Sequence, residues 1–297
     1  MPGASVVGTQ RGDSDAVQKL GFSRVATSTK SIHSGSITHD CCETGSAVFL
    51  HVYALSKYIL RRLSRKDEGT YSCYVGTTSG KFRKSVVLQV GAFVTPVMKY
   101  EKRDTSSMLI CSILSVYPRP SITWHMDNIS ITDSRVEEIG SLGSFHINST
   151  VNVTGSKSPY ECAIKNSLLE QTWTGHWMMK DDLHKMQSEQ VSFSCDVANN
   201  LFQQNQDIIV TWSRMENGTS FILAKFESAS QNIVTNEPRL SWEKELINQG
   251  HFSSTLKELE ILDNGEYLCH ISSSNYTFLT LQTLHVGKLT IGLANGF

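Results

Sequence analysis

The chain has 297 residues, which is enough for two or three domains of about 100 residues each, so a single small domain is disfavoured. Its 27 Lys and Arg residues nearly balance its 28 Asp and Glu residues, and this balance disfavours binding to nucleic acid or to an anionic membrane through bulk charge. The 7 cysteines contain no CxxC pair, which excludes a zinc ribbon and a thioredoxin-like motif.

Residues 1–50 are rich in Ser, Thr and Gly and contain few large apolar side chains, so we expect a poorly ordered N-terminal segment. The tripeptide RGD at residues 11–13 is compatible with an integrin-type adhesion signal, but a tripeptide is weak evidence and a solvated segment without that role is favoured. The sequence HDCC at residues 39–42 offers imidazole and thiolate to a soft metal. Its spacing matches no closed tetrahedral site, so we expect Cys41 and Cys42 to be free or adventitiously paired thiols.

Residues 51–92 contain the turn signature DEGTYSC, in which Tyr71 lies two positions before Cys73. The same pattern recurs as DNGEYLC near the other end of the chain, where Asp263 is the counterpart of Asp67. At the offset that superimposes these aspartates, the final runs SVVLQVG and TLQTLHVG also align, so the two segments are predicted to share the last strands of one fold. The preceding RRLSRK is a basic segment with a phosphorylatable Ser64, and a solvated loop is the favoured interpretation.

The first half of this segment has no counterpart in the chain. The same offset places the counterpart of Cys195 before Met1, and no Trp precedes Trp124. Cys41 and Cys42 lie less than half as far from Cys73 as Cys195 lies from Cys269, which is too close for a pair that links two sheets. We therefore predict an incomplete domain at 51–92, with Cys73 lacking a partner.

Residues 93–181 show short alternating runs such as SSMLICSIL and SITWHM, which predict antiparallel strands with one buried face. Cys111 is followed by Trp124 and later by Cys162, with Tyr160 two positions before that second cysteine. This spacing is typical of an immunoglobulin sandwich, in which the cysteines link the sheets, the Trp packs on the disulfide and the Tyr hydroxyl closes a corner. The short separation of the cysteines predicts a constant-type domain with a Cys111–Cys162 disulfide.

Residues 182–287 repeat these anchors with a longer separation. Cys195 is followed by Trp212 and then, after a longer stretch than in the preceding segment, by Cys269, which Tyr267 precedes. The longer separation leaves room for the extra strands of a variable-type domain with a Cys195–Cys269 disulfide. Arg239 precedes the Asp263 turn, and in variable-type domains an Arg and an Asp at such positions form an ion pair at the base of the sandwich. Two unpaired surface charges are the alternative.

Five Asn-x-Ser/Thr sequons and widely spaced cysteines favour an oxidising, glycosylating route outside the cytosol. No apolar stretch reaches the length of a secretory signal or a membrane span, and the tail at 288–297 is too short and polar to cross a bilayer. No GxSxG, HExxH, P-loop or GxGxxG motif occurs, so we predict neither an enzyme nor a cofactor. The sequons lie at Asn128, Asn148, Asn152, Asn217 and Asn275.

Longer runs in the chain resemble one family closely. VTPVMKYEKRDTSSMLICSILSVYPRPSITWHMDN, QTWTGHWMMKDDLHKMQSEQVSFSC and VTWSRMENGT are similar to the B-seven and butyrophilin-related T-cell co-signalling ligands of the immunoglobulin superfamily, over about residues 65–287. The resemblance implies an all-β chain of tandem immunoglobulin-like sandwiches, here incomplete variable-type, constant-type and variable-type. It also implies a membrane glycoprotein at the external side of the plasma membrane, held by an anchor that we expect to be missing from this chain.

The resemblance further implies receptors of the immunoglobulin superfamily on T or NK cells as partners, with activation raised or lowered by their engagement. In this family the receptor usually meets the front sheet of the membrane-distal variable domain, of which this chain contains the last strands, about Tyr74 to Val90. Because the preceding strands are missing, we expect weak receptor binding. The alternative is a soluble or adhesion-type immunoglobulin protein that acts as a spacer or decoy.

Overall fold

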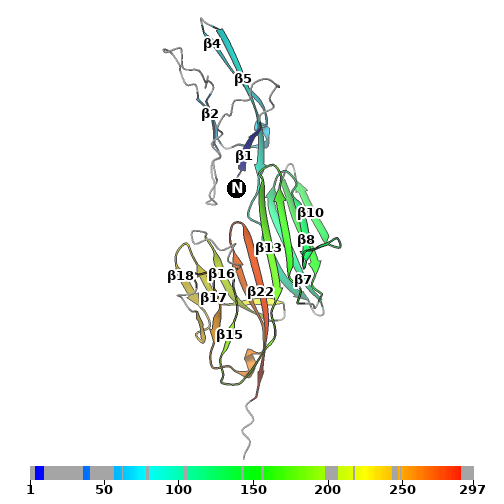
Figure 1. The fold of residues 1–297 in the computed structure, drawn as a ribbon, viewed down its shortest axis with the longest axis vertical. Coiled ribbons are helices and arrows are strands. Elements are labelled where there is room, and N and C mark those ends of the chain that lie inside the picture. Colours follow the sequence, from blue (N-terminus) through cyan, green and yellow to red (C-terminus); the bar gives the residue numbers. More distant parts are fainter. Residues whose placement is uncertain are drawn as a thin grey trace, which may run out of the picture.

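The computed structural model describes the chain from residue 63 to residue 288 with short gaps, and before that only the backbone of three strands at 4–9, 36–40 and 57–61. The gaps lie at 78–79, 104–105, 142–143, 155–156, 198–206, 217, 243–246 and 248. The described strands form three regions along the long axis of the molecule (Figure 1). We name them the upper region (β1 to β5), the middle region (β6 to β13) and the lower region (β14 to β22).

The upper region contains a three-stranded sheet in the order β1 (Ala4–Thr9), β5 (Gly80–Ala92) and β4 (Gly69–Thr77). A separate hairpin pairs β2 (Ser36–Asp40) with β3 (Lys57–Arg61). Strands β1 and β2 thus fall within residues 1–50, where the sequence predicts poor order. The run ASVVGT carries two adjacent valines, which favour strand, and it pairs along the otherwise open edge of β5.

The middle region is built from two sheets. One has the order β10 (Arg135–Ser141), β11 (Ser144–Asn152), β7 (Ser106–Val116) and β6 (Val97–Arg103). The facing sheet contains β9 (Ile129–Ile131), β8 (Ser121–Met126), β12 (Tyr160–Asn166) and β13 (Gln171–Met179). Burial along β12 alternates from one position to the next, as expected for a strand with one face on a core.

The lower region has a small back sheet and a larger front sheet. The back sheet has the order β15 (Val191–Phe193), β20 (Ser254–Leu256) and β19 (Leu240–Trp242). The front sheet contains β14 (Leu183–Met186), β16 (Ile209–Glu216), β17 (Thr219–Glu227), β18 (Asn232–Thr235), β21 (Gly265–Ser272) and β22 (Tyr276–Gly287). The strands β17 and β18 occupy the extra sequence between Cys195 and Cys269.

The middle and lower regions share one ten-stranded sheet. Strand β13 runs parallel to the first half of β22, and β14 continues along its second half. Between them the N–H of Lys180 donates to the carbonyl of Leu281 at 2.9 Å, so Lys180 extends the ladder beyond the end of β13. Figure 1 shows β13 and β22 side by side at the centre of the molecule.

The two cores lie on opposite faces of this shared sheet. In β21, Tyr267 and Cys269 face the core of the lower region, whereas Leu268 between them belongs to the core of the middle region. In β22, Tyr276 and Leu284 belong to the lower core, whereas Leu279 and Leu281 belong to the middle core. Strand β22 is therefore buried on both faces.

Candidate interaction surfaces

The structure brings together the expected anchors of the middle region. Cys111 and Cys162 form a disulfide with their Cα atoms 6.8 Å apart. Trp124 lies opposite Cys162 on the neighbouring strand, is 1% exposed, and donates from Nε1 to Ser149 Oγ at 2.9 Å. The Tyr160 hydroxyl accepts a hydrogen bond from the N–H of Thr154 at 3.3 Å. These contacts fix the middle sandwich as a rigid scaffold.

The lower region repeats the arrangement around the Cys195–Cys269 disulfide, whose Cα atoms are 6.2 Å apart. Trp212 lies opposite Cys269 and donates from Nε1 to the carbonyl of Phe252 at 3.0 Å. The Tyr267 hydroxyl donates to the carbonyl of Asp263 at 2.9 Å. Burial raises the pKa of Tyr267 above its usual value, so this hydroxyl stays protonated as a donor.

Arg239 and Asp263 meet at the base of the lower region. Two guanidinium nitrogens donate to the two carboxylate oxygens, each at 2.9 Å, and Glu237 binds the same guanidinium at 3.1 Å. Burial raises the pKa of the Asp263 carboxyl, but hydrogen bonds from Arg239 and from the N–H of Glu260 outweigh it and leave the pKa below its usual value. The pair therefore remains ionised and ties the β19 end to the turn before β21.

In the upper region, the turn at Asp67 has the same local contacts. The Asp67 carboxylate accepts from the N–H of Ser64 at 2.7 Å, and the Tyr71 hydroxyl donates to the carbonyl of Asp67 at 2.7 Å. Ser64 therefore caps a short turn. Residues 64–66 are exposed, as the solvated loop expected for RRLSRK requires, but Arg61 ends β3 and Leu63 is buried. The RGD segment and the side chains of Cys41, Cys42 and Cys73 lie outside the described residues.

A buried side-chain amide, that of Asn166, helps to join the upper and middle regions. The Asn166 side chain donates to the carbonyls of Ala92 at 3.2 Å and Tyr117 at 3.0 Å, and its oxygen accepts from the N–H groups of Leu168 and Leu169. A Cβ on Gly91 would lie only 2.7 Å from the Leu169 side chain, so glycine allows this close approach. The end of β5 is thus clamped to the middle region.

The junction between the middle and lower regions covers the outer face of β21 and β22. Leu268, Leu279 and Leu281 are 8%, 2% and 0% exposed there. At its border, Lys102 of β6 donates to the Glu266 carboxylate at 2.5 Å. A Cβ on Gly218 would lie 3.0 Å from the Lys102 carbonyl, so the β16–β17 turn also packs closely on β6. The β21–β22 part of the front sheet of the lower region is therefore covered by its own chain, whereas Ile222 of β17 and Val234 of β18 are 49% and 47% exposed.

Four of the five sequons fall on described residues. Asn128, Asn152 and Asn275 are exposed, and Asn148 is partly exposed. Asn148 and Asn152 are four positions apart on β11 and project from the same outer face of their sheet, about 13 Å apart. Asn217 lies outside the described residues.

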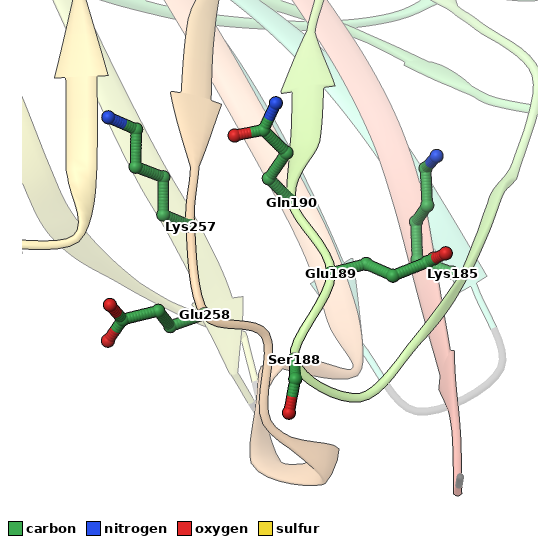
Figure 2. Close-up of a pocket in the computed structure, with 6 residues that line it drawn as sticks. All are labelled: Lys185, Ser188, Glu189, Gln190, Lys257 and Glu258. Carbon is green, nitrogen blue, oxygen red and sulfur yellow. The ribbon is translucent and has the colours of Figure 1, made fainter.

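A shallow depression of about 550 Å³ lies at the base of the lower region. Figure 2 shows its six lining residues on strand β14 and on two adjacent loops, with their side chains pointing apart rather than toward a common centre. Two of the side chains are lysines and two are glutamates, so no net charge selects a ligand. The six residues are Lys185, Ser188, Glu189, Gln190, Lys257 and Glu258.

Neither a membrane-spanning helix nor a metal cluster occurs among the residues that the structure describes. Among them, no helix is long and apolar enough to cross a membrane. No group of three or more His, Cys, Asp or Glu side chains in this part of the chain is placed to hold a metal ion.

Sequence reasoning missed the residues that join the middle and lower regions. Trp173 and Trp177 of β13 are fully buried in the middle core on either side of Gly175, where a Cβ would lie 2.6 Å from Met98 Sδ. The signal for the junction was present in YTFLTLQTLHV, where apolar residues occur at both even and odd positions and therefore on both faces of the strand.

Comparisons with known proteins bear on the family of the chain. The Immunoglobulin V-set domain family matches residues 179–286. Human HERV-H LTR-associating protein 2 is 62% identical over 226 residues, which are 76% of this chain and 55% of that protein, so the chain spans about half the length of this relative. Rat V-set domain-containing T-cell activation inhibitor 1 is 26% identical over 147 residues, covering 45% of this chain and 50% of that protein. The solved ectodomain of mouse nectin-like molecule 4 is 14% identical with a TM-score of 0.33, and the match covers 86% of this chain and 95% of that one.

Proposed function

We propose that this chain, which contains an immunoglobulin V-set domain and is similar to HERV-H LTR-associating protein 2, is a cell-surface ligand for T-cell and NK-cell receptors that modulates T-cell activation. The observation that carries this proposal is the 62% identity over 226 residues. The 26% identical relative named as a T-cell activation inhibitor supplies the link to T cells. Whether the signal activates or inhibits depends on the receptor.

We place the receptor contact on one face of β4 and β5, to which Ser72, Tyr74, Arg83 and Ser85 belong, and we call it the front face. These strands lie at the end of the molecule farthest from the lower region (Figure 1). Their register pairs Ser72 with Ser85 and Tyr74 with Arg83, so the sequence at these positions is polar and aromatic rather than aliphatic. Such a composition suits a modest, partly wet protein interface in which Tyr and Arg supply most of the binding energy.

The exposed sequons support a glycoprotein at the external side of the plasma membrane. Asn128, Asn152 and Asn275 are accessible to the glycosylation machinery, and both disulfides require an oxidising compartment. We propose that glycans at Asn148 and Asn152 cover the outer face of the β10–β11–β7–β6 sheet. A receptor would then be directed to other faces of the molecule.

A second candidate function is a spacer or decoy in a soluble or adhesion-type protein. The sheet shared by the middle and lower regions favours it, because a rigid pair of sandwiches holds a distal module at a fixed distance. The two functions differ in where a partner binds. A ligand needs the β4–β5 face, whereas a spacer does not.

The test is binding of fluorescent multimers of the full chain to T and NK cells, since multimers amplify weak affinities. We expect staining by the wild type and at least a tenfold loss on Arg83→Glu, which reverses one charge at the interface. Lys257→Glu is the matched control, because it makes the same charge change at the exposed base of the lower region. Plate-bound wild type should change the proliferation of receptor-stimulated T cells. Absence of staining, or equal staining by Arg83→Glu, would contradict the proposal.

A further inference from the structure

The front faces of the upper and lower regions have the same backbone pairing and different residues. Strands β4 and β5 pair Gly69 with Leu88, and β21 and β22 pair Gly265 with Leu284, so both partners are displaced along the sequence by the same amount. The same displacement holds along the ladder to Cys73 opposite Lys84 and Cys269 opposite Thr280. Each front-face position in one region therefore has a defined counterpart in the other.

At three of these positions the lower region is aliphatic and the upper region is polar. Leu268, Leu279 and Leu281 correspond to Ser72, Arg83 and Ser85. An aliphatic front face is thus not a requirement of this strand arrangement. In the lower region, the three leucines are covered by the middle core, which includes Met98 and Tyr100 of β6.

The backbone that connects the middle and lower regions runs alongside β22. The N–H of Thr174 donates to the carbonyl of Asn275 at 3.1 Å where β13 meets the start of β22, and Lys180 continues the ladder into β14. Hinges are usually loop residues that absorb large changes in φ and ψ. Here Lys180 is held by a backbone hydrogen bond to β22, and only the exposed Asp181 and Asp182 separate it from β14.

We propose that the middle and lower regions form one rigid, cooperatively folding unit in which the middle region permanently covers the β21–β22 part of the front face of the lower V-set domain. That part of the face is then an intramolecular docking surface and is closed to external receptors, whereas Ile222 of β17 and Val234 of β18 remain exposed. The two V-type segments consequently have different roles. The upper one has polar residues at its front-face positions, whereas the lower one packs the corresponding positions against the middle region. This proposal does not depend on the receptor function proposed above.

The first test is a charge-reversal cycle at the Lys102–Glu266 ion pair, read by hydrogen exchange of the full chain. Glu266→Lys and Lys102→Glu should each speed amide exchange at least threefold in β6 and β13 as well as in β21 and β22. The double variant should return to within twofold of the wild type, because the pair is restored with its charges exchanged. Acceleration confined to the strand that carries the substitution would overturn the proposal, as would no change in either single variant.

The second test transfers the polar face of the upper region to the lower one. The triple variant Leu268→Ser, Leu279→Arg and Leu281→Ser should separate the regions, with two unfolding transitions in place of one and a larger radius of gyration by X-ray scattering. Ile222→Ser is the matched control, since Ile222 is an exposed aliphatic residue of the same sheet and its loss should leave both readouts unchanged. A triple variant with a single transition and unchanged scattering would overturn the proposal. If it fails to fold, the charge-reversal cycle decides.

Discussion

The turns at Asp67 and Asp263 are two copies of one local structure in different surroundings. Each forms a short 3-10 turn, η1 (Arg65–Asp67) and η2 (Ile261–Asp263), with the aspartate side chain accepting a backbone N–H three positions earlier at 2.7 Å. In each, a tyrosine four positions later donates to the aspartate carbonyl, at 2.7 and 2.9 Å. The short-range sequence is therefore sufficient for the turn.

The surroundings of the two turns differ strongly. Tyr267 is 1% exposed, whereas Tyr71 is 40% exposed. Asp263 is paired with Arg239 through two hydrogen bonds, and no arginine in the described part of the chain forms such a pair with Asp67. The motif therefore specifies backbone geometry, while burial and ion pairing require an opposing sheet that the motif does not encode.

Removal of the aspartate side chain should give the largest difference in stability between the two turns. Asp263→Ala leaves the Arg239 guanidinium without its buried partner, and we expect a loss of about 3 kcal/mol in the free energy of unfolding. Asp67→Ala removes mainly the cap of a short turn, so about 1 kcal/mol is expected at the β4–β5 ladder. Hydrogen exchange of the two ladders measures both values in the same chain. Equal losses at the two sites would contradict the assigned roles.

The Asp263 pair also predicts acid sensitivity of the lower region. Its folded-state pKa lies below the unfolded value, so the contribution of the pair is present above the unfolded pKa and is lost as pH falls through the folded pKa. The acid limb of the stability curve should therefore be less steep in Asp263→Ala than in the wild type. Denaturant titrations of both proteins between about pH 5 and about pH 2 test this, and parallel curves would refute it.

Substitution of the turn glycines should instead show that the two sites are alike. Gly69 and Gly265 have φ values of 151° and 153°, in a region that L-residues rarely adopt. Gly69→Ala and Gly265→Ala should each cost about 1 to 2 kcal/mol, because the strain is local to the backbone. Exchange rates of the flanking ladders provide the measurement. A cost at one site only would mean that surroundings, rather than backbone strain, select glycine.

The sequence was sufficient to predict features that depend on local patterns or on repeated spacing. The constant offset between the two turn signatures predicted a shared register of the final strands, and the backbone pairing of Gly69 with Leu88 and Gly265 with Leu284 repeats it. The spacing around Trp124 and Trp212 predicts that each Trp packs on a disulfide, and in the structure each lies opposite a disulfide cysteine on the neighbouring strand. These features require only that a strand alternate its faces and that turns have fixed lengths.

The shared sheet could not be predicted in the same way. Alternation predicts one buried face and one solvated face for each strand. It therefore predicts no packing partner for Leu279 and Leu281. Apolar residues at both odd and even positions of β22 indicate burial on both faces, but they do not identify the covering element. Lys102 and Met98, which provide part of that cover, lie far upstream in the sequence, and no local pattern relates them to β22.

The smallest contrast that we expect is at the tyrosine hydroxyls, and it isolates the effect of burial from that of geometry. Both hydroxyls make one hydrogen bond to an aspartate carbonyl at similar distances, so Tyr→Phe removes the same interaction in each. At Tyr267 the abandoned carbonyl remains buried, and we expect Tyr267→Phe to cost about 1 kcal/mol. At Tyr71 water can replace the hydroxyl, so Tyr71→Phe should cost less than about 0.5 kcal/mol. Exchange of the β4 and β21 amides measures the difference. Equal costs would show that the upper turn is as well shielded from water as the lower one, and the contrast in burial would then have no energetic consequence.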